Sequence, residues 1–270
     1  MSKKKAAKKK TEPGEKVIKI CTEMVAADPA KSMQAAISER PDNIMPLGAG
    51  FAQPGLAAAL AGVDAPVSIA AVYTKLWQNG RTLDVAFLGN VNAQVKQKII
   101  TYASRWMQVV NLRLNFVAGT AGQIRITTTP GGSWSYIGTD ARTIAAGSPT
   151  MNYGWLTPTT PDAEYSRVVL HEFGHAIGCI HEHQHPAAGI PWDRPAVYAY
   201  YAQQGWNRQQ VDNNIFARYS ANQLNASVYD KRSIMHYAVP NELTVGNFEV
   251  GWNRVFSPLD IAHMRRVYPA

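Results

Sequence analysis

Residues 171–182 read HEFGHAIGCIHE and constrain this chain more than any other segment. His171 and His175 are four positions apart, so on a helix they share one face and both imidazoles can reach a single ion. Glu172 directly follows the first histidine, which places a carboxylate near that ion without making it a ligand. The segment therefore predicts a metal-binding helix, with Glu172 as the general base for the water that the ion activates.

Gly178 and His181 extend the pattern in steps of three residues. A straight helix would carry His181 away from the first two histidines. Because a glycine takes a left-handed conformation at little cost, Gly178 can end the helix and let His181 supply a third ligand from another direction. Three protein ligands leave a fourth position for water, which is typical of a catalytic zinc ion rather than a structural one.

The complete pattern, HExxHxxGxxH, is the metzincin signature, and residues 168–182 resemble a metzincin active-site helix. Glu182, directly after the third histidine, resembles the astacin family in particular, in which this glutamate helps to seat the mature N-terminus. Residues 233–237, Ser-Ile-Met-His-Tyr, resemble the astacin Met-turn. The resemblance implies that Met235 forms an apolar floor beneath the metal. It also implies that Tyr237 binds zinc at rest and then hydrogen-bonds the reacting carbonyl.

The preceding part of the chain has the pattern of a mixed α/β subdomain. Alternating apolar residues predict strands over 81–88, 112–117 and 123–128, and helical spacing predicts a helix over 92–110. The resemblance covers roughly residues 81–269. It implies an α+β, zincin-like fold of two subdomains, with a mixed twisted sheet, an active-site helix and zinc in the cleft between the subdomains.

The resemblance also suggests where a substrate would bind. Residues 133–138 resemble the SYxG segment of astacins, and residues 149–155 are expected to form the edge strand above the cleft. An extended peptide would pair with such an edge through backbone hydrogen bonds. The residues assigned to this edge are Met151, Asn152, Tyr153, Gly154 and Trp155.

Helices are expected in the second half of the chain as well. The active-site helix is predicted over 166–180, and helical pieces broken at Gly205 are predicted over 193–216. Ser257, followed by proline and then by an aspartate in the first turn, is a strong signal for a C-terminal helix that ends near residue 268.

Four further side chains near the motif or upstream of it have more than one interpretation. His183 and His185 could hold a second metal, but lining the rim of the site or bonding to neighbouring groups is the favoured interpretation. Cys179 is expected to pack in the core because the ligand set is already complete. Cys21 is either an ordinary cysteine or a thiolate that caps the zinc and holds the enzyme latent.

The chain divides into three parts by composition. The net charge of +8 is concentrated in residues 1–16, which hold seven lysines and two glutamates and predict a disordered basic tail. Residues 17–65 form an extension that is a possible pro-segment or linker, with helical character up to residue 40 broken at Asp28. By resemblance to astacin pro-segments, an aspartate from it could reach the zinc: Asp28, Asp42 or Asp64. Residues 66–270 are the expected catalytic domain.

The chain carries no obvious membrane or secretion signal. No run of about 18 uncharged apolar residues is present, so no membrane span is expected. The lysine-rich start is not followed by an apolar stretch of the Sec type. We therefore expect a protein that is cytoplasmic or exported by another route. We also expect it to be a monomer.

These features predict a zinc-dependent endopeptidase that hydrolyses peptide bonds in proteins, with one zinc ion on His171, His175 and His181. The alternative is a latent or inactive zinc-binding protein whose basic tail docks weakly on anionic partners such as nucleic acid or acidic lipid.

Overall fold

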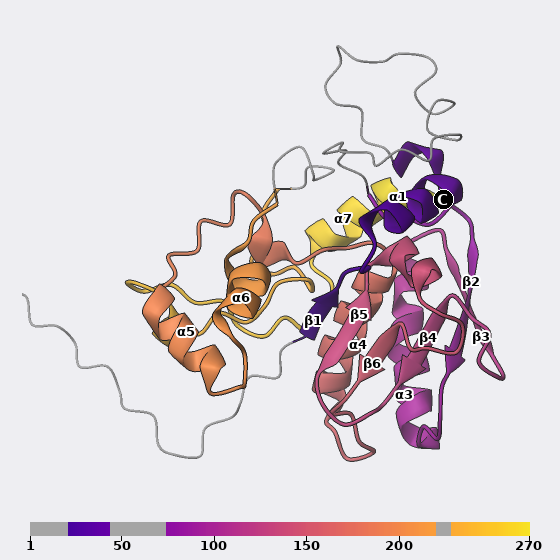
Figure 1. The fold of residues 1–270 in the computed structure, drawn as a ribbon, viewed down its shortest axis with the longest axis horizontal. Coiled ribbons are helices and arrows are strands. Elements are labelled where there is room, and N and C mark those ends of the chain that lie inside the picture. Colours follow the sequence, from indigo (N-terminus) through magenta and orange to yellow (C-terminus); the bar gives the residue numbers. More distant parts are fainter. Residues whose placement is uncertain (1–20, 44–73, 220–227) are drawn as a thin grey trace, which may run out of the picture.

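The computed structural model describes residues 21–43, 74–219 and 228–270. In this part of the chain a six-stranded mixed sheet has the order β1-β5-β6-β4-β2-β3 (Figure 1). β5 runs antiparallel to β6, and the other neighbouring pairs are parallel. The strands are β1 Cys21–Met24, β2 Thr82–Phe87, β3 Arg113–Val117, β4 Ile124–Thr127, β5 Ser133–Tyr136 and β6 Met151–Tyr153. The expected strands over 81–88, 112–117 and 123–128 are thus confirmed.

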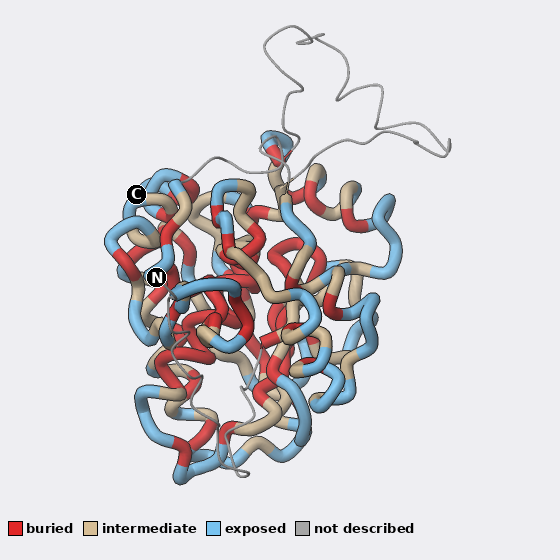
Figure 2. The backbone as a smooth tube through the Cα atoms, turned by 90° about the vertical axis from the view of Figure 1, so that its left-hand side faces the viewer, coloured by how far each residue is buried: buried red, intermediate tan, exposed pale blue. Residues whose placement is uncertain are grey.

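Two helices support the sheet. α3 (Ala93–Ala103) packs on α4 (Asp162–Ala176), and α4 contacts β1, β5 and β6. Asn92 caps α3 by accepting hydrogen bonds from the first-turn amides. The predicted helix over 92–110 ends earlier, since it continues after Ala103 as a 3₁₀ helix, η2 (Ser104–Gln108). The buried segments lie in the interior of the molecule, with exposed segments around them (Figure 2). Large side chains are buried there, among them Trp77, Trp106, Tyr153, Tyr165 and Phe173.

The prediction that residues 149–155 form the edge strand is wrong. β6 lies between β5 and β4, so both of its sides are hydrogen-bonded within the sheet. Gly154 and Trp155 follow the strand in a turn. β5 follows β6 toward this end of the sheet, and β1 from the N-terminal extension pairs with β5 in parallel and forms the edge. Sequence alternation indicates a strand, but the order of strands depends on contacts between distant segments.

The extension is packed against the catalytic part. Residues 21–24 are a strand rather than the expected helix, because they pair with β5. Helix α1 (Pro29–Glu39) begins at the predicted break in helical character, with Asp28 as its N-cap. The short 3₁₀ helix η1 (Pro41–Asn43) follows. The basic tail over 1–16, most of the expected linker and Asp64 lie outside the described residues, so those expectations stay predictions.

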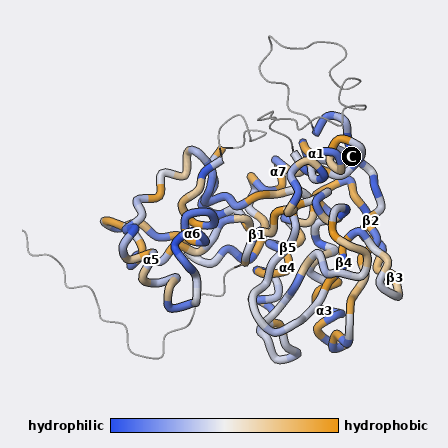
Figure 3. The backbone as a smooth tube through the Cα atoms, viewed as in Figure 1, coloured by the Kyte–Doolittle hydropathy of each residue, from blue (hydrophilic) through white to orange (hydrophobic). Residues whose placement is uncertain are grey.

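The second subdomain consists of short helices and loops. It contains α5 (Arg194–Ala202), α6 (Arg208–Val211), the π-helix η5 (Asp212–Phe216) and the 3₁₀ helix η7 (Asn241–Leu243). Gly205, with φ of +81°, separates α5 from α6 as expected. The two small cores of the second subdomain contain Val197, Tyr201, Ile215, Val239 and Val250. Figure 3 shows hydrophobic and hydrophilic stretches alternating through both subdomains.

Three further elements complete the fold around the cleft. The 3₁₀ helices η3 (Gly138–Thr143) and η4 (Glu182–Gln184) follow β5 and the third histidine, respectively. α7 (Pro258–Val267) has Ser257 as its cap in a complete capping box, as the sequence predicts. None of the helices formed by the described residues is long and apolar enough to span a membrane.

Candidate metal centre and catalytic site

The three histidines of the motif converge on one point. Nε2 of His175 lies 3.2 Å from Nε2 of His171 and 3.0 Å from Nε2 of His181. All three side chains are buried. Within the described ranges they are the only group of three or more histidine, cysteine or acidic residues whose ligand atoms lie close enough together to hold a metal ion.

Hydrogen bonds at the other ring nitrogen orient two of the three imidazoles, those of His171 and His175. Nδ1 of His171 is bonded to the carbonyl of Ile234 at 2.8 Å, and Nδ1 of His175 to the carbonyl of Cys179 at 2.9 Å. A proton held at Nδ1 by a carbonyl leaves the Nε2 lone pair for a metal. Burial lowers the pKa of His175 to about 4. Burial also lowers the pKa of His171 and His181 well below the usual value. Three neutral, convergent imidazoles match the donor set of a catalytic zinc ion.

Gly178 produces the turn that brings in the third ligand. α4 ends at Ala176, and Gly178 has φ of +102°, which a residue with a side chain rarely adopts. A Cβ at this position would also meet Leu76 at 2.8 Å. The helix therefore stops one residue after His175, and the chain returns so that His181 faces the first two histidines.

Glu172 is enclosed beside the histidines. Its side chain is fully buried, and in the described part of the chain neither carboxylate oxygen accepts a hydrogen bond of normal geometry. Burial raises the pKa of Glu172 to about 8, while the neighbouring Cys21 thiol and Arg167 lower it. A buried carboxyl with available lone pairs near the metal position is suited to accept a proton from water.

Met235 lies beneath the helix that carries the histidines. It is 4% exposed, and a Cβ at Gly174 would collide with its sulfur. Gly174 is thus what allows the Met-turn to pack directly under α4. The sequence analysis did not assign it a role, although a glycine in a helix interior is a signal of close packing because it weakens the helix by about 1 kcal/mol relative to alanine.

Asp260 holds the Met-turn in place. Its carboxylate accepts hydrogen bonds from Oγ of Ser233 at 2.7 Å and from the amide of Ile234 at 2.9 Å. The carbonyl of Ile234 in turn contacts His171. Asp260 therefore positions a metal ligand from α7, although its sequence context shows only its place in the first turn of that helix.

Tyr237 faces the histidines from the second subdomain. Its ring centroid lies 4.3 Å from that of His181 and is stacked at 4.3 Å and 18° on the ring of His183. Its hydroxyl donates a hydrogen bond to the carbonyl of Cys21 in β1. Burial, followed by the nearby Cys21, raises the pKa of Tyr237 well above the usual value, so the phenol stays protonated.

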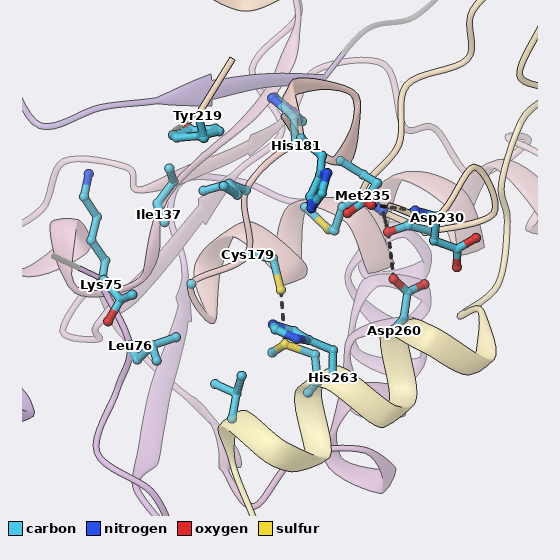
Figure 4. A pocket seen from close by; sticks show the side chains of 18 of the residues that line it. Lys75, Leu76, Ile137, Cys179, His181, Tyr219, Asp230, Met235, Asp260 and His263 are labelled. Atoms are coloured by element: carbon cyan, nitrogen blue, oxygen red, sulfur yellow. Dashed lines mark hydrogen bonds between the residues drawn. The ribbon is translucent and has the colours of Figure 1, made fainter. Parts of the chain in front are cut away.

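Glu182 joins the third ligand to the Met-turn. Its amide donates to the carbonyl of Met235 at 3.1 Å, and its carboxylate accepts from the amide of Asp230 at 2.7 Å. Burial is the main cause that raises the pKa of Glu182, to about 7. It lines a cavity of about 350 Å³ between the end of α4, the Met-turn and α7 (Figure 4). Seating of an N-terminus by Glu182 stays a prediction.

The cysteines and the two additional histidines have other neighbours. Cys21 is not in the metal group of the described residues, and its sulfur lies 4.0 Å from Nη1 of Arg167. Cys179 packs with its sulfur 3.4 Å from that of Met264, away from the metal position (Figure 4). His183 is bonded to the carbonyl of Asn214. His185 accepts from the amide of Ala187. A second metal on His183 and His185 gains no support from the part of the chain that the structure describes.

A mixed sheet, a histidine-bearing helix ended by glycine and a methionine turn beneath it define a metzincin-type zinc peptidase. The family model for Astacin, a peptidase family, matches residues 70–268. The chain therefore belongs to the astacin family of zinc metallopeptidases, whose substrates are proteins or peptides, and zinc is the metal that the histidine trio holds.

Solved structures agree with this assignment. Myroilysin is 47% identical, with a TM-score of 0.70 over 73% of this chain and 96% of that one. A second myroilysin structure, also 47% identical, has a TM-score of 0.59 over 73% and 86% of the two chains. High choriolytic enzyme 1, a hatching enzyme zinc-protease from Oryzias latipes (Medaka fish), is 17% identical with a TM-score of 0.51 over 72% and 94%, and shares the fold. No curated protein matches the chain.

Proposed function

We propose that the chain is an endopeptidase that cleaves proteins within extended segments and that the described form is its latent state. The observation that carries the first part is the convergence of three neutral imidazoles beside the buried, unbonded carboxyl of Glu172. This site lies next to β5, a strand that pairs with an extended segment on its cleft side. A cleft that binds an extended backbone by strand addition does not require a free chain end.

The residues divide the work of hydrolysis between them. His171, His175 and His181 would hold the zinc ion, which would supply a Lewis acid for lowering the pKa of water and polarising the scissile carbonyl. Glu172 accepts a proton from the attacking water and returns it to the leaving amine. Tyr237 stays protonated, and once its hydroxyl is released from the carbonyl of Cys21 it donates a hydrogen bond to the oxyanion. Met235 packs beneath α4, and Asp260 holds the Met-turn in position.

Latency is supported by the position of β1. Oε2 of Glu23 lies 3.4 Å from Nδ1 of His181. The carbonyl of Cys21 accepts a hydrogen bond from the hydroxyl of Tyr237. The Tyr219 hydroxyl holds the other oxygen of Glu23 at 2.8 Å. A segment that pairs with β5 and engages these groups excludes a substrate from the same place. We infer that residues 17–65 act as a pro-segment and residues 66–270 as the catalytic domain.

Hydrolysis of an internally quenched peptide tests the proposed activity. Protein freed of its pro-segment should cleave the peptide, and a zinc chelator should stop the reaction. Glu172→Gln should bind zinc with unchanged stoichiometry and lose at least about 10³-fold in kcat, because the proton acceptor is gone while the ligands remain. Retained turnover in this zinc-loaded variant would refute the role of Glu172.

A further inference from the structure

A short segment, residues 74–77, supports the end of the helix that carries the first two metal ligands. Nε1 of Trp77 donates a hydrogen bond to the carbonyl of Ala176 at 2.8 Å, and Ala176 is the last residue of α4. The last carbonyls of a helix have no partner inside the helix, so a buried helix end needs a donor from elsewhere. The fully buried indole of Trp77 is such a donor.

The same segment packs directly against the turn that brings in the third ligand. A Cβ at Gly178 would meet Cδ2 of Leu76 at 2.8 Å and the carbonyl oxygen of Lys75 at 3.4 Å. Leu76 lines the cavity beside this turn (Figure 4). Because closely packed groups transmit displacements, a shift of Lys75 and Leu76 would also move Gly178, which lies three residues before His181.

Asn43 of the N-terminal extension holds this segment in place. It is completely buried. Its Nδ2 donates to the carbonyl of Leu76 at 2.8 Å, and its Oδ1 accepts from the amide of Leu76 at 3.0 Å and from Oγ1 of Thr74 at 2.7 Å. Nδ2 also donates to the carbonyl of Ala36 in α1 at 2.8 Å. These bonds use both donors and both lone pairs of the side-chain amide, so Asn43 ties α1 firmly to the segment that supports α4.

A separate set of charged contacts docks α1 on the catalytic part. The carboxylate of Glu39 lies 2.9 Å from Nη1 of Arg81 and 3.1 Å from Nη1 of Arg142. Arg142 also donates to the carbonyl of Ala35 at 3.1 Å. Its contacts are with α1 itself, so its substitution weakens docking of the helix without removing a bond to residues 74–77. Both α1 and η1 lie outside the residues that match the family model.

We propose that Asn43 is a positioning residue for the metal site, and that α1 and η1 support the catalytic part rather than inhibit it. Asn43 acts through residues 74–77 on the end of α4 and on Gly178, and thereby on the direction from which His181 approaches the other two ligands. The pro-segment then has two opposed parts, since β1 blocks the site whereas α1 and η1 keep it formed. This division rests on the proposed function, but the effect of Asn43 on metal binding does not.

Hydrogen exchange in the zinc-free, chelated full-length protein tests the connection to the turn. The amides of residues 177–179 bond to carbonyls in the last turn of α4 and report how firmly the turn is held. We expect Asn43→Ala to speed their exchange about tenfold, because Leu76 loses both of its partners. Arg142→Met is the matched control and should leave exchange at these amides unchanged. Equal acceleration by the two substitutions, or none by Asn43→Ala, would overturn the proposal.

Metal binding tests the consequence for the site. Competition with a fluorescent chelator should give a zinc affinity about tenfold lower for Asn43→Ala than for the parent protein, and an unchanged affinity for Arg142→Met. With saturating cobalt(II) in place of zinc, the absorption spectrum should change in Asn43→Ala alone, because it reports the arrangement of the ligands. A parental zinc affinity and cobalt spectrum in Asn43→Ala would refute the positioning role.

Trp77→Phe tests the same path if Asn43→Ala does not fold. It removes the indole donor to Ala176 and keeps an aromatic ring, so it should also speed exchange at residues 177–179 and lower zinc affinity. Where melting curves show both variants folded, their losses should not multiply in the double variant, since both act through residues 74–77. No effect of Trp77→Phe, or multiplied losses, would overturn the path. If no peptide is cleaved while the ranking of zinc affinities holds, the proposed function fails and the positioning role of Asn43 stands.

Discussion

At the scale of single residues, two of the three metal ligands take their orientation from backbone carbonyls, a role that the motif does not reveal. His171 takes its orientation from the carbonyl of Ile234, 63 residues further along the chain, and His175 from that of Cys179. The motif identifies the ligands, but their tautomers are set by these carbonyls. The same holds for Glu172, whose environment is formed by Cys21 and Arg167.

Glu172→Gln should stabilise the zinc-free protein increasingly as the pH rises. The pKa of Glu172 is about 8 in the folded protein and about 4.3 in an unfolded chain. The folded state therefore binds more protons between these values, so its stability falls as pH rises through this window. Glutamine removes this pH dependence. It should therefore raise the free energy of unfolding by on the order of 3 kcal/mol at pH 8 and by much less at pH 5. Urea unfolding at both values checks it, and a pH-independent difference would contradict it.

Gly174→Ala should destabilise the protein although alanine favours helices. The new methyl group would collide with the sulfur of Met235 and lie 3.3 Å from the Trp106 ring. Overpacking of this kind costs about 1–3 kcal/mol, more than the gain of about 1 kcal/mol in helix propensity. Chemical denaturation measures the loss. The same change in a Met235→Ala background should cost less, and an equal cost in both backgrounds would argue against this contact.

At the scale of elements, α7 connects the end of the chain to the metal site. Asp260 completes the capping box with Ser257, and the same carboxylate bonds to the Met-turn. The capping signal could be read from sequence because it is local. The second role could not, because Ser233 and Ile234 lie 27 and 26 residues away.

Asp260→Ala should therefore do more than weaken a helix. Losing the bonds to Ser233 and Ile234 should lower zinc affinity about tenfold, as for other groups that support metal ligands. Ser257→Ala is the matched control, because it removes only the cap at about 1 kcal/mol and should leave zinc affinity unchanged. Competition with a fluorescent chelator measures both. Equal zinc affinity in the two variants would show that Asp260 acts only as a cap.

At the scale of the whole molecule, the N-terminal segment has two distinct anchors. β1 engages the catalytic groups, whereas α1 is held outside the cleft. Buried Asp140 accepts hydrogen bonds from Ser32 and from Lys75. Glu39 is paired with Arg81 and Arg142. Residues between the anchors are largely exposed, with Val25 at 64%. Removal of β1 therefore need not disturb α1.

Proteolytic cleavage between the two anchors should activate the zinc-loaded protein. Elastase, which accepts small apolar residues such as Val25 and Ala27, should cut this exposed stretch and free β1 to leave. The rate of peptide hydrolysis should rise at least about tenfold. This corresponds to removing about 1.4 kcal/mol of the free energy by which β1 disfavours substrate binding. Mass spectrometry locates the cut, and Glu172→Gln treated in the same way controls for elastase activity. A complete cut without a rise in rate would refute latency through β1.

Metal removal should lower the stability of the whole domain. The ligands belong to α4 and the loop after it, and the Met-turn beneath them leads to Tyr237 in the core of the second subdomain. Because zinc binds the folded state, a free concentration about 1,000 times its dissociation constant adds about 4 kcal/mol. Calorimetry with and without a chelator measures this difference. An unchanged melting temperature would show that no ion occupies the site.

The sequence by itself determined the metal-binding histidines, the glycine turn and most helices and strands, because each depends on spacing within a few residues, and it predicts Glu172 as the base. Only the tertiary structure decided that β6 is interior and that residues 21–24 form an edge strand beside β5. It also decided the partners of Asp260. The physical reason is that strand order and buried contacts join segments far apart in the chain, which local periodicity and propensity do not specify.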